Sequence, residues 1–165
     1  MISLKLKQAN RNQGFTIVEL LIVIVVIGIL AALVITTYGG IQAKARNGKR
    51  ASDIQSVQTQ LEAFYAQNQF YPSLTDLNSQ TWRATNMKSL DNISLVDPSS
   101  TCNPNTATTC VAAAAALKTY SYKVGDAAAN ASCEAVDTNC AQYILTASYE
   151  GTYNGSATMT KNNLD

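Results

Sequence analysis

Histidine is absent from this 165-residue chain, and proline occurs only at positions 72, 98 and 104. Without histidine, neither a Ser-His nor a Cys-His pair can be built to activate a nucleophile. No glycine-rich phosphate-binding loop occurs, and the carboxylates of the C-terminal half are scattered singly. These absences argue against an enzyme. The sequence indicates no catalytic residue, no cofactor and no metal site.

Charged side chains are also scarce, at 14% of the residues, against roughly 25% in an average soluble domain. Ser, Thr, Asn and Gln replace them, which suits a surface that packs against copies of itself. The net charge of +1 hides an uneven distribution, because Lys5, Lys7 and Arg11 lie in the first 14 residues, where no acid occurs. The strongly basic surface of a dedicated nucleic-acid binder is not indicated.

One long apolar run interrupts this polar composition. Residues 20–35 carry no charge and no hydrogen-bonding side chain, and the run counted from Phe15 has 21 residues. A helix needs roughly 20 residues to cross a bilayer, so we predict a membrane-spanning helix. A secretory signal peptide is the alternative, but only Ala31-Ala32-Leu33 could serve as its small-residue cleavage site.

Glu19 lies at the entrance to this run. A carboxylate in mid-bilayer costs on the order of 2.5 to 3.5 kcal/mol, so it needs a partner of opposite charge. Cleavage between Gly14 and Phe15 would create an α-amino group, with a pKa of about 7.7 to 8.0, one helical turn before Glu19. We therefore predict that proteolysis makes the counter-charge of this carboxylate.

The sequence Gly14-Phe15-Thr16-Ile17-Val18-Glu19-Leu20, with a basic leader before it and the apolar run after it, resembles the class III leader of type IV pilins and pseudopilins. The resemblance implies that a prepilin peptidase removes residues 1–14, that Phe15 is N-methylated and that Glu19 acts in filament assembly. In that family the glutamate is held to neutralise the Phe amine of a neighbouring subunit. A single-pass anchor with an isolated interfacial glutamate is the alternative.

The helical pattern continues beyond the apolar run. Residues that recur every three or four positions predict one apolar stripe on an amphipathic helix. They are Ala51, Ile54, Val57, Leu61, Phe64 or Tyr65, and Asn68. The opposite side is expected to carry Gln55, Gln58, Gln60 and Glu62. An ordinary core helix that follows a membrane anchor would show the same stripe.

One long helix from about Phe15 to Gln69 results. Residues 15–40 form its transmembrane or filament-core half, and residues 41–70 form its amphipathic half. Family members often carry a proline within the apolar helix, and none occurs here before Pro72. Gly39-Gly40 should fray the helix locally, because each glycine costs about 1 kcal/mol in a helix interior relative to alanine.

Lys44, Arg46, Lys49 and Arg50 form a basic cluster just after the span. By the positive-inside rule this cluster competes with the basic leader, so charge alone does not orient the chain. Export of the C-terminal part is favoured because long domains translocate largely regardless of charge. Asp53 is spaced to pair with Lys49 and Arg50. We expect a solvated or inter-subunit helix face, with nucleic-acid binding as the weaker alternative.

Residues 71–165 are predicted to form a globular head. The stretch from Pro72 to Asn105 is rich in Ser, Thr, Asn and Asp, which indicates loop with one short helix. The alanine-rich residues 111–117 fit either a strand edge or a helical turn.

Alternating side chains over Tyr120–Val124 and Tyr143–Glu150 indicate half-buried strands. Asn154-Gly155 is typical of a hairpin turn. Three or four antiparallel strands are therefore expected to pack on the amphipathic half of the helix. The predicted fold class is α+β, that of the type IV pilins.

All four cysteines, Cys102, Cys110, Cys133 and Cys140, lie in the head. Their spacings do not match usual zinc patterns, and no histidine is present, so structural disulfides are expected, with three possible connectivities. Local pairing, Cys102 with Cys110 and Cys133 with Cys140, would close two polar loops. A nested pairing is the alternative. Disulfides indicate an oxidising compartment for the head.

Together these features predict a structural subunit of a type IV pilus, a homopolymeric helical filament used in adhesion, twitching motility or DNA uptake. By resemblance, its partners would be a prepilin peptidase, an assembly ATPase and a membrane platform. Before assembly the chain would be a single-pass protein of the cytoplasmic membrane with its N-terminus inside, and afterwards part of an extracellular pilus.

Two alternatives remain. One is a pseudopilin of a type II secretion system, which Phe70-Tyr71-Pro72 favours by resemblance to the major pseudopilins. Those proteins tend to bind calcium through a carboxylate-rich loop, and no such cluster stands out in this sequence. The other alternative is a membrane-anchored binding domain that does not polymerise.

Overall fold

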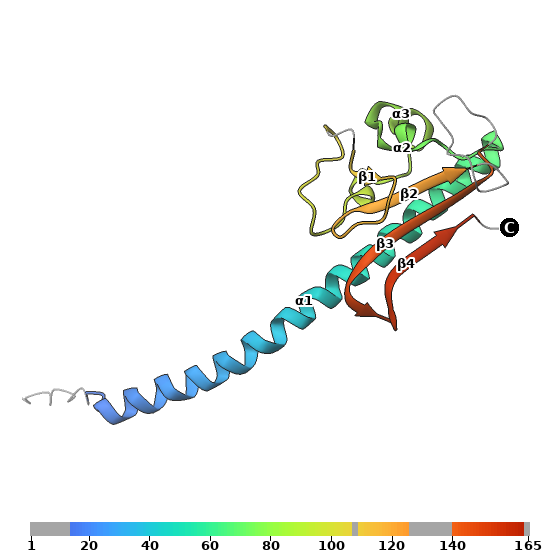
Figure 1. The fold of residues 1–165 in the computed structure, drawn as a ribbon. Coiled ribbons are helices and arrows are strands. Elements are labelled where there is room, and N and C mark those ends of the chain that lie inside the picture. The colour runs from blue at the N-terminus through green and yellow to red at the C-terminus, as the bar shows by residue number, and fades with distance from the viewer. Residues whose placement is uncertain (1–13, 107–108, 126–139, 164–165) are drawn as a thin grey trace, which may run out of the picture. The chain divides into compact units, whose positions relative to one another are not determined.

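A computed structural model describes residues 14–106, 109–125 and 140–163 of the chain (Figure 1). In sequence order the elements are α1 (Ile17–Asn68), α2 (Leu74–Asn78), α3 (Gln80–Asn86), the 3₁₀ helix η1 (Asn92–Leu95), β1 (Val111–Ala112), β2 (Tyr120–Gly125), β3 (Gln142–Tyr153) and β4 (Ser156–Asn162). The chain divides into two compact units. The first ends at Gly40 and the second begins at Ile41, so the boundary falls within α1.

The first unit contains the apolar part of α1. Its large apolar side chains from Ile17 to Ile35 are all about half exposed or more. The fraying expected at Gly39-Gly40 is absent, because α1 runs unbroken through both glycines. A glycine lowers helix stability without removing a backbone hydrogen bond, and helical residues on both sides continue the cooperative structure.

The second unit contains a four-stranded sheet in the order β1-β2-β3-β4. The pairs β2–β3 and β3–β4 are antiparallel, as expected. The pair β1–β2 is parallel, so the sheet is mixed rather than purely antiparallel. Residues 113–119 return the chain to the start of β1, so that β2 begins with Tyr120 beside Val111 and runs in the same direction as β1. Of the alanine-rich stretch, only Val111–Ala112 is strand.

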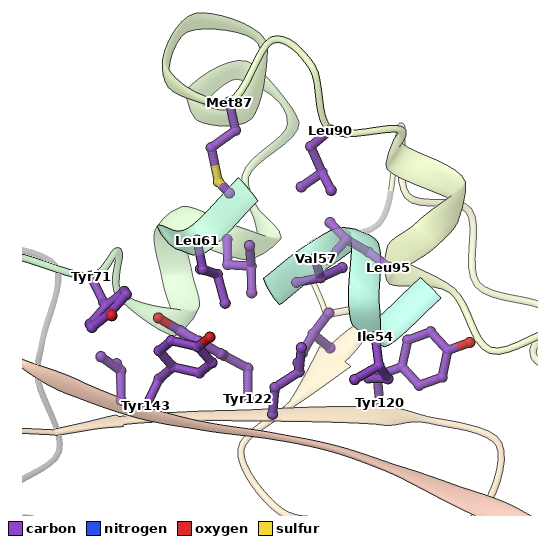
Figure 2. Close-up of a cluster of buried hydrophobic side chains, with 14 of the residues drawn as sticks. Ile54, Val57, Leu61, Tyr71, Met87, Leu90, Leu95, Tyr120, Tyr122 and Tyr143 are labelled. Atoms are coloured by element: carbon purple, nitrogen blue, oxygen red, sulfur yellow. The ribbon is translucent and has the colours of Figure 1, made fainter. Parts of the chain in front are cut away.

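The predicted alternation of the long strands matches their burial, except that Ser121 of β2 is also buried. The inward side chains of β2 and β3 are buried, and they are Tyr120, Tyr122, Val124, Tyr143, Leu145, Ala147 and Tyr149. All of these except Tyr149 pack with the stripe of α1 and with apolar side chains from the segment after it (Figure 2). On α1 that stripe consists of Ile54, Val57, Leu61 and Phe64, with Tyr65 only partly buried. The prediction is wrong at Asn68, which is exposed. Each large apolar side chain buried in this way contributes about 1.5 to 3 kcal/mol.

The segment between α1 and the sheet is more helical than expected. It holds α2, α3 and η1 where one short helix was predicted. Ser73 and Asp76 form a capping box at the start of α2, and Ser79 caps α3 by accepting a hydrogen bond from the backbone N–H of Trp82. Such caps satisfy backbone donors that have no partner within a short helix.

Polar side chains of α1 also bind the sheet and the segment after α1. Asp53 accepts a 2.9 Å hydrogen bond from the Tyr120 hydroxyl, and Glu62 accepts one of 2.8 Å from the Tyr143 hydroxyl. Gln58 donates to the backbone carbonyl of Asn162 over 2.9 Å. The expectation that Gln58 lies on the solvent side is therefore wrong, since it is buried. Burial raises the pKa of Tyr120 and of Tyr143 above the ordinary range, so both phenols remain donors.

Arg50 is almost fully buried, with 1% of its side chain exposed. Its Nε and Nη2 donate to the two carboxylate oxygens of Asp97 over 2.6 and 2.9 Å, and Nη1 donates to Asn47 Oδ1 over 2.7 Å. The expected pairing of Asp53 with Lys49 is present, whereas Arg50 pairs with Asp97 instead. The prediction of a solvated helix face is wrong at Arg50, because Asp97 lies 47 residues away in the sequence and spacing along the helix cannot indicate it.

Glu150 of β3 joins the same network. Its carboxylate accepts hydrogen bonds of 2.7 and 2.5 Å from Arg46 and one of 2.9 Å from Arg50. Asn47 bonds both the backbone N–H and the backbone carbonyl of Glu150, over 3.0 and 3.1 Å. The hydrogen bonds from Arg46 are the main cause that lowers the pKa of Glu150 to about 2. These contacts fix the end of β3 against α1.

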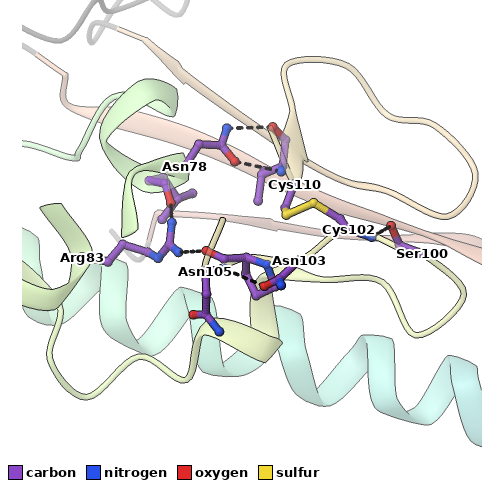
Figure 3. The surroundings of a disulfide bond; sticks show 10 residues. Asn78, Arg83, Ser100, Cys102, Asn103, Asn105 and Cys110 are labelled. Atoms are coloured by element: carbon purple, nitrogen blue, oxygen red, sulfur yellow. Dashed lines mark hydrogen bonds between the residues drawn. A yellow bond between two sulfur atoms is a disulfide. The ribbon is translucent and has the colours of Figure 1, made fainter. Parts of the chain in front are cut away.

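Cys102 and Cys110 form a disulfide, one of the pairings left open by the sequence (Figure 3). Cys140 is also disulfide-bonded, and Cys133 lies outside the described residues. The buried Arg83 holds the loop closed by Cys102 and Cys110, because its guanidinium donates to the carbonyl of Pro104 over 2.7 Å.

Replacement of Arg50 by methionine should lower the free energy of unfolding by about 3 to 5 kcal/mol, because Asp97 would remain buried without a counter-charge. Chemical denaturation of the full chain in detergent micelles can measure this. Trp82, the single tryptophan, packs on Phe64 and reports the state of the core. The control is Lys44→Met at an exposed position, expected within about 0.5 kcal/mol of the wild type. Equal losses in both variants would contradict the assigned role.

The Glu150 carboxylate should stabilise the fold in a pH-dependent way. Its folded pKa of about 2 lies below the ordinary value of 4.5, so its contribution is full above about pH 4.5 and is lost as the pH falls toward 2. The carboxylate is one-third exposed, which limits the effect to about 1 kcal/mol. The difference in unfolding free energy between the wild type and Glu150→Gln should therefore shrink over this range. A difference that stays constant with pH would contradict the prediction.

Candidate functional site

The predicted cleavage site lies just before α1. Gly14, Phe15 and Thr16 are exposed and have no regular secondary structure. The Phe15 side chain is 85% exposed. Residues 1–13 of the predicted leader lie outside the described residues. A protease cleft can bind an exposed segment of this kind, because it has no regular secondary structure. The cleavage after Gly14 and the methylation of Phe15 remain predictions.

Glu19 is held by a capping box at the first turn of α1. Its carboxylate oxygen Oε2 accepts hydrogen bonds from the backbone N–H and the hydroxyl of Thr16, over 2.8 and 2.7 Å. In return, the Thr16 hydroxyl accepts from the backbone N–H of Glu19 over 3.2 Å. This reciprocal arrangement satisfies two donors at the helix start. The role of Thr16 was not predicted from the sequence, although the spacing Thr-x-x-Glu before an apolar run indicates a capping box.

The capping box places the carboxylate of Glu19 beside the peptide bond that joins Phe15 and Thr16. The α-amino group that cleavage would create belongs to Phe15, the residue directly before the Thr16 donor. The predicted amine would therefore form one residue before the Thr16 groups that Glu19 binds. The carboxylate also has polar partners before any cleavage, which lowers the cost of holding it near lipid.

The apolar part of α1 is hydrophobic on all sides. Within the described residues, α1 is the one helix that is long and apolar enough to cross a membrane by length and composition. None of the side chains from Ile17 to Ile35 is buried. A helix that is apolar all round is stable only when lipid or other apolar helices surround it. This segment suits a single-pass membrane anchor.

The described part of the head shows no metal-binding cluster. No group of three or more His, Cys, Asp or Glu side chains is placed there to hold a metal ion. Asp126, Glu134 and Asp137 lie outside the described residues. A hollow of about 360 Å³ lies between α1 and the segment after α3, over Phe64 and Met87. Lys88 is its one titratable side chain, so the hollow offers no acid–base pair.

Comparison with known proteins finds a family match at the N-terminus. Residues 9–35 match the model of the prokaryotic N-terminal methylation motif. The chain is 40% identical over 64 residues to the type II secretion system core protein G of Dickeya chrysanthemi, and 35% identical over 68 residues to that of Escherichia coli (strain K12). It is 34% identical over 61 residues to the type IV major pilin protein PilA of Myxococcus xanthus (strain DK1622).

These matches are partial. They cover 39, 41 and 37% of this chain, and 42, 47 and 28% of the three relatives. The chain thus spans less than half the length of each of these relatives. No solved structure matches it significantly. The chain carries the prokaryotic N-terminal methylation motif at its N-terminus, and over part of its length it is similar to type II secretion system core proteins G and to a type IV major pilin.

Proposed function

We propose that this chain is a structural subunit of a filament, and that the filament is the pseudopilus of a type II secretion system. The observation that carries the first part is the exposed, wholly apolar segment of α1 with one carboxylate capped at its start. Such a surface needs a membrane first and apolar neighbours afterwards. The second part is supported by the relatives named core protein G. The role is structural, not enzymatic.

Assembly would exchange lipid for protein around the same helix. The precursor would be anchored by residues 15–40, with the N-terminus inside and the head outside. A prepilin peptidase would remove residues 1–14, and Phe15 would be methylated on its new amine. Copies of the chain would then leave the membrane, and their apolar helices would pack together in the filament core. There the Glu19 carboxylate would neutralise a Phe15 amine, which removes two isolated charges from an apolar setting.

A type IV pilus is the second candidate function. It is favoured by the similarity to the major pilin PilA. In that case the filament would act in adhesion, twitching motility or DNA uptake. Deletion of the gene separates the two, because loss of a pseudopilin stops protein secretion, whereas loss of a major pilin removes surface fibres. In both cases an assembly ATPase and a membrane platform would be the partners.

The mature protein should begin at N-methylated Phe15. Mass spectrometry of the native N-terminus checks this directly. Gly14→Val should block cleavage, because a branched side chain would enter a cleft that accepts glycine. Gly28→Ala is the matched control, since a Cβ at Gly28 meets no atom within 4 Å, and this variant should be cleaved normally. Mature wild-type protein that retains Met1 would contradict the proposal.

Replacement of Glu19 by alanine should leave insertion and cleavage intact but remove or strongly reduce filaments. Glu19→Gln separates charge from capping, because glutamine can keep hydrogen bonds to Thr16 without the negative charge. We expect Glu19→Gln to fail in assembly as Glu19→Ala does. Electron microscopy of sheared fractions, with immunoblots for the processed form, gives the measurement. Normal filaments in Glu19→Gln would show that ion pairing is not required.

A further inference from the structure

Asn-Gly pairs are the sites in proteins where asparagine most readily loses its side-chain amide. The backbone nitrogen of the following residue attacks the side-chain carbonyl carbon, and glycine hinders this attack least because it has no Cβ. The chain contains two such pairs, Asn47-Gly48 and Asn154-Gly155. One pair lies in an exposed turn and the other in a buried part of a helix, so their rates of amide loss can be compared within one protein.

Asn154 and Gly155 form the two-residue turn between β3 and β4. Tyr153 pairs with Ser156 across the turn, and neither Asn154 nor Gly155 belongs to a strand. Both have positive φ, 51° and 81°, as this kind of hairpin turn requires. Both are exposed to solvent. Within the described residues, the side-chain amide of Asn154 makes no hydrogen bond, so it is free to rotate and water can reach it.

The side chain of Asn47, by contrast, is buried and hydrogen-bonded, and its backbone is helical. It lies inside α1 and is 2% exposed. Its Nδ2 donates to the carbonyl of Glu150 over 3.1 Å, and its Oδ1 accepts from Arg50 and from the backbone N–H of Glu150. Attack on its amide would need all three bonds to break, and the nitrogen of Gly48 is fixed in the helix. Asn47 can therefore react only when this region opens.

We propose that Asn154 is a site of spontaneous deamidation in the folded protein, whereas Asn47 is protected. The backbone nitrogen of Gly155 bonds to Cγ of Asn154, the bond from Cγ to Nδ2 breaks, and Nδ2 leaves as ammonia with the proton from the Gly155 amide. A five-membered cyclic imide remains. Water then opens the ring at either of its two carbonyls, which gives aspartate or the β-linked isoaspartate at position 154.

The two products act differently on the hairpin. Aspartate tolerates the left-handed conformation of the turn, so it adds a negative charge and keeps the register of β3 and β4. Isoaspartate lengthens the backbone by one methylene group, which a two-residue turn cannot absorb. The isoaspartate form should therefore loosen the hairpin near Glu150, four residues before Asn154, where β3 is fixed to α1.

The experiment uses the full chain in detergent micelles at mildly alkaline pH, in water labelled with heavy oxygen. Peptide mapping by mass spectrometry then separates the asparagine, aspartate and isoaspartate forms at both positions. In the folded protein, Asn154 should convert at least about tenfold faster than Asn47, because Asn47 reacts only through opening. In urea the two rates should become similar, because both asparagines then lie in an unfolded chain and each is followed by glycine.

Two results would overturn the proposal. One is conversion of Asn154 in the folded chain that is no faster than conversion of Asn47. The other is incorporation of heavy oxygen into the hairpin peptide of Asn154→Gln at the wild-type rate, since glutamine would need a less favourable six-membered ring. Loss of conversion in Asn154→Gln, with unchanged behaviour at Asn47, supports the assignment to Asn154.

Discussion

The apolar surface of α1 from Ile17 to Ile35 is the constraint on which the proposed function of this protein depends, both in the membrane and in a filament. Every large apolar side chain in this part of the helix is exposed in the isolated chain, and water is a poor solvent for such a surface. The helix must therefore always have apolar surroundings. A membrane provides them for a single chain, and the helices of other copies provide them in a filament. A passage from one to the other changes the neighbours but leaves the helix intact.

Within the second unit, α1 carries several charged side chains, whereas Glu19 is the one charged residue in the described part of the first unit. Arg46, Lys49 and Arg50 are matched by three carboxylates, Glu150, Asp53 and Asp97. Three of the four bases in the cluster that follows the apolar run are thus paired within the folded chain, and Lys44 is exposed. These ion pairs also join α1 to the end of β3 and to the loop that follows η1, so they fix parts of the head that the apolar core does not reach.

Local patterns in the sequence predicted the parts of the fold that depend on neighbouring residues. The stripe of α1 from Ile54 to Phe64, the alternation in β3 and the Asn154-Gly155 turn all follow from backbone geometry, and the structure has each of them. In β2 the alternation fails at Ser121, which is buried. The parallel pairing of β1 was not predictable in this way, because it depends on the path of a loop. Nor was the partner of Arg50, since Asp97 is brought to it only by the complete fold.

The candidate site shows the same division. Glu19 drew attention as a charge in an apolar run, and its spacing from Thr16 contains the signal of a capping box that only the structure made evident. The proposed pairing with a neighbouring Phe15 amine lies beyond a single chain, so neither the sequence nor the fold of one copy can display it. For that reason the resemblance to a family carried more of the functional prediction than the local chemistry did.

Arg83 has a consequence for how the surface of the head can vary. Its buried guanidinium donates to the backbone carbonyls of Leu77 and Pro104 and to the side chain of Asn92. Two of these three acceptors are main-chain atoms, which every amino acid possesses. Only the carbonyl of Pro104 belongs to the loop closed by Cys102 and Cys110. Arg83 thus binds this loop through a main-chain atom, so a different side chain at a neighbouring loop position would leave this contact in place.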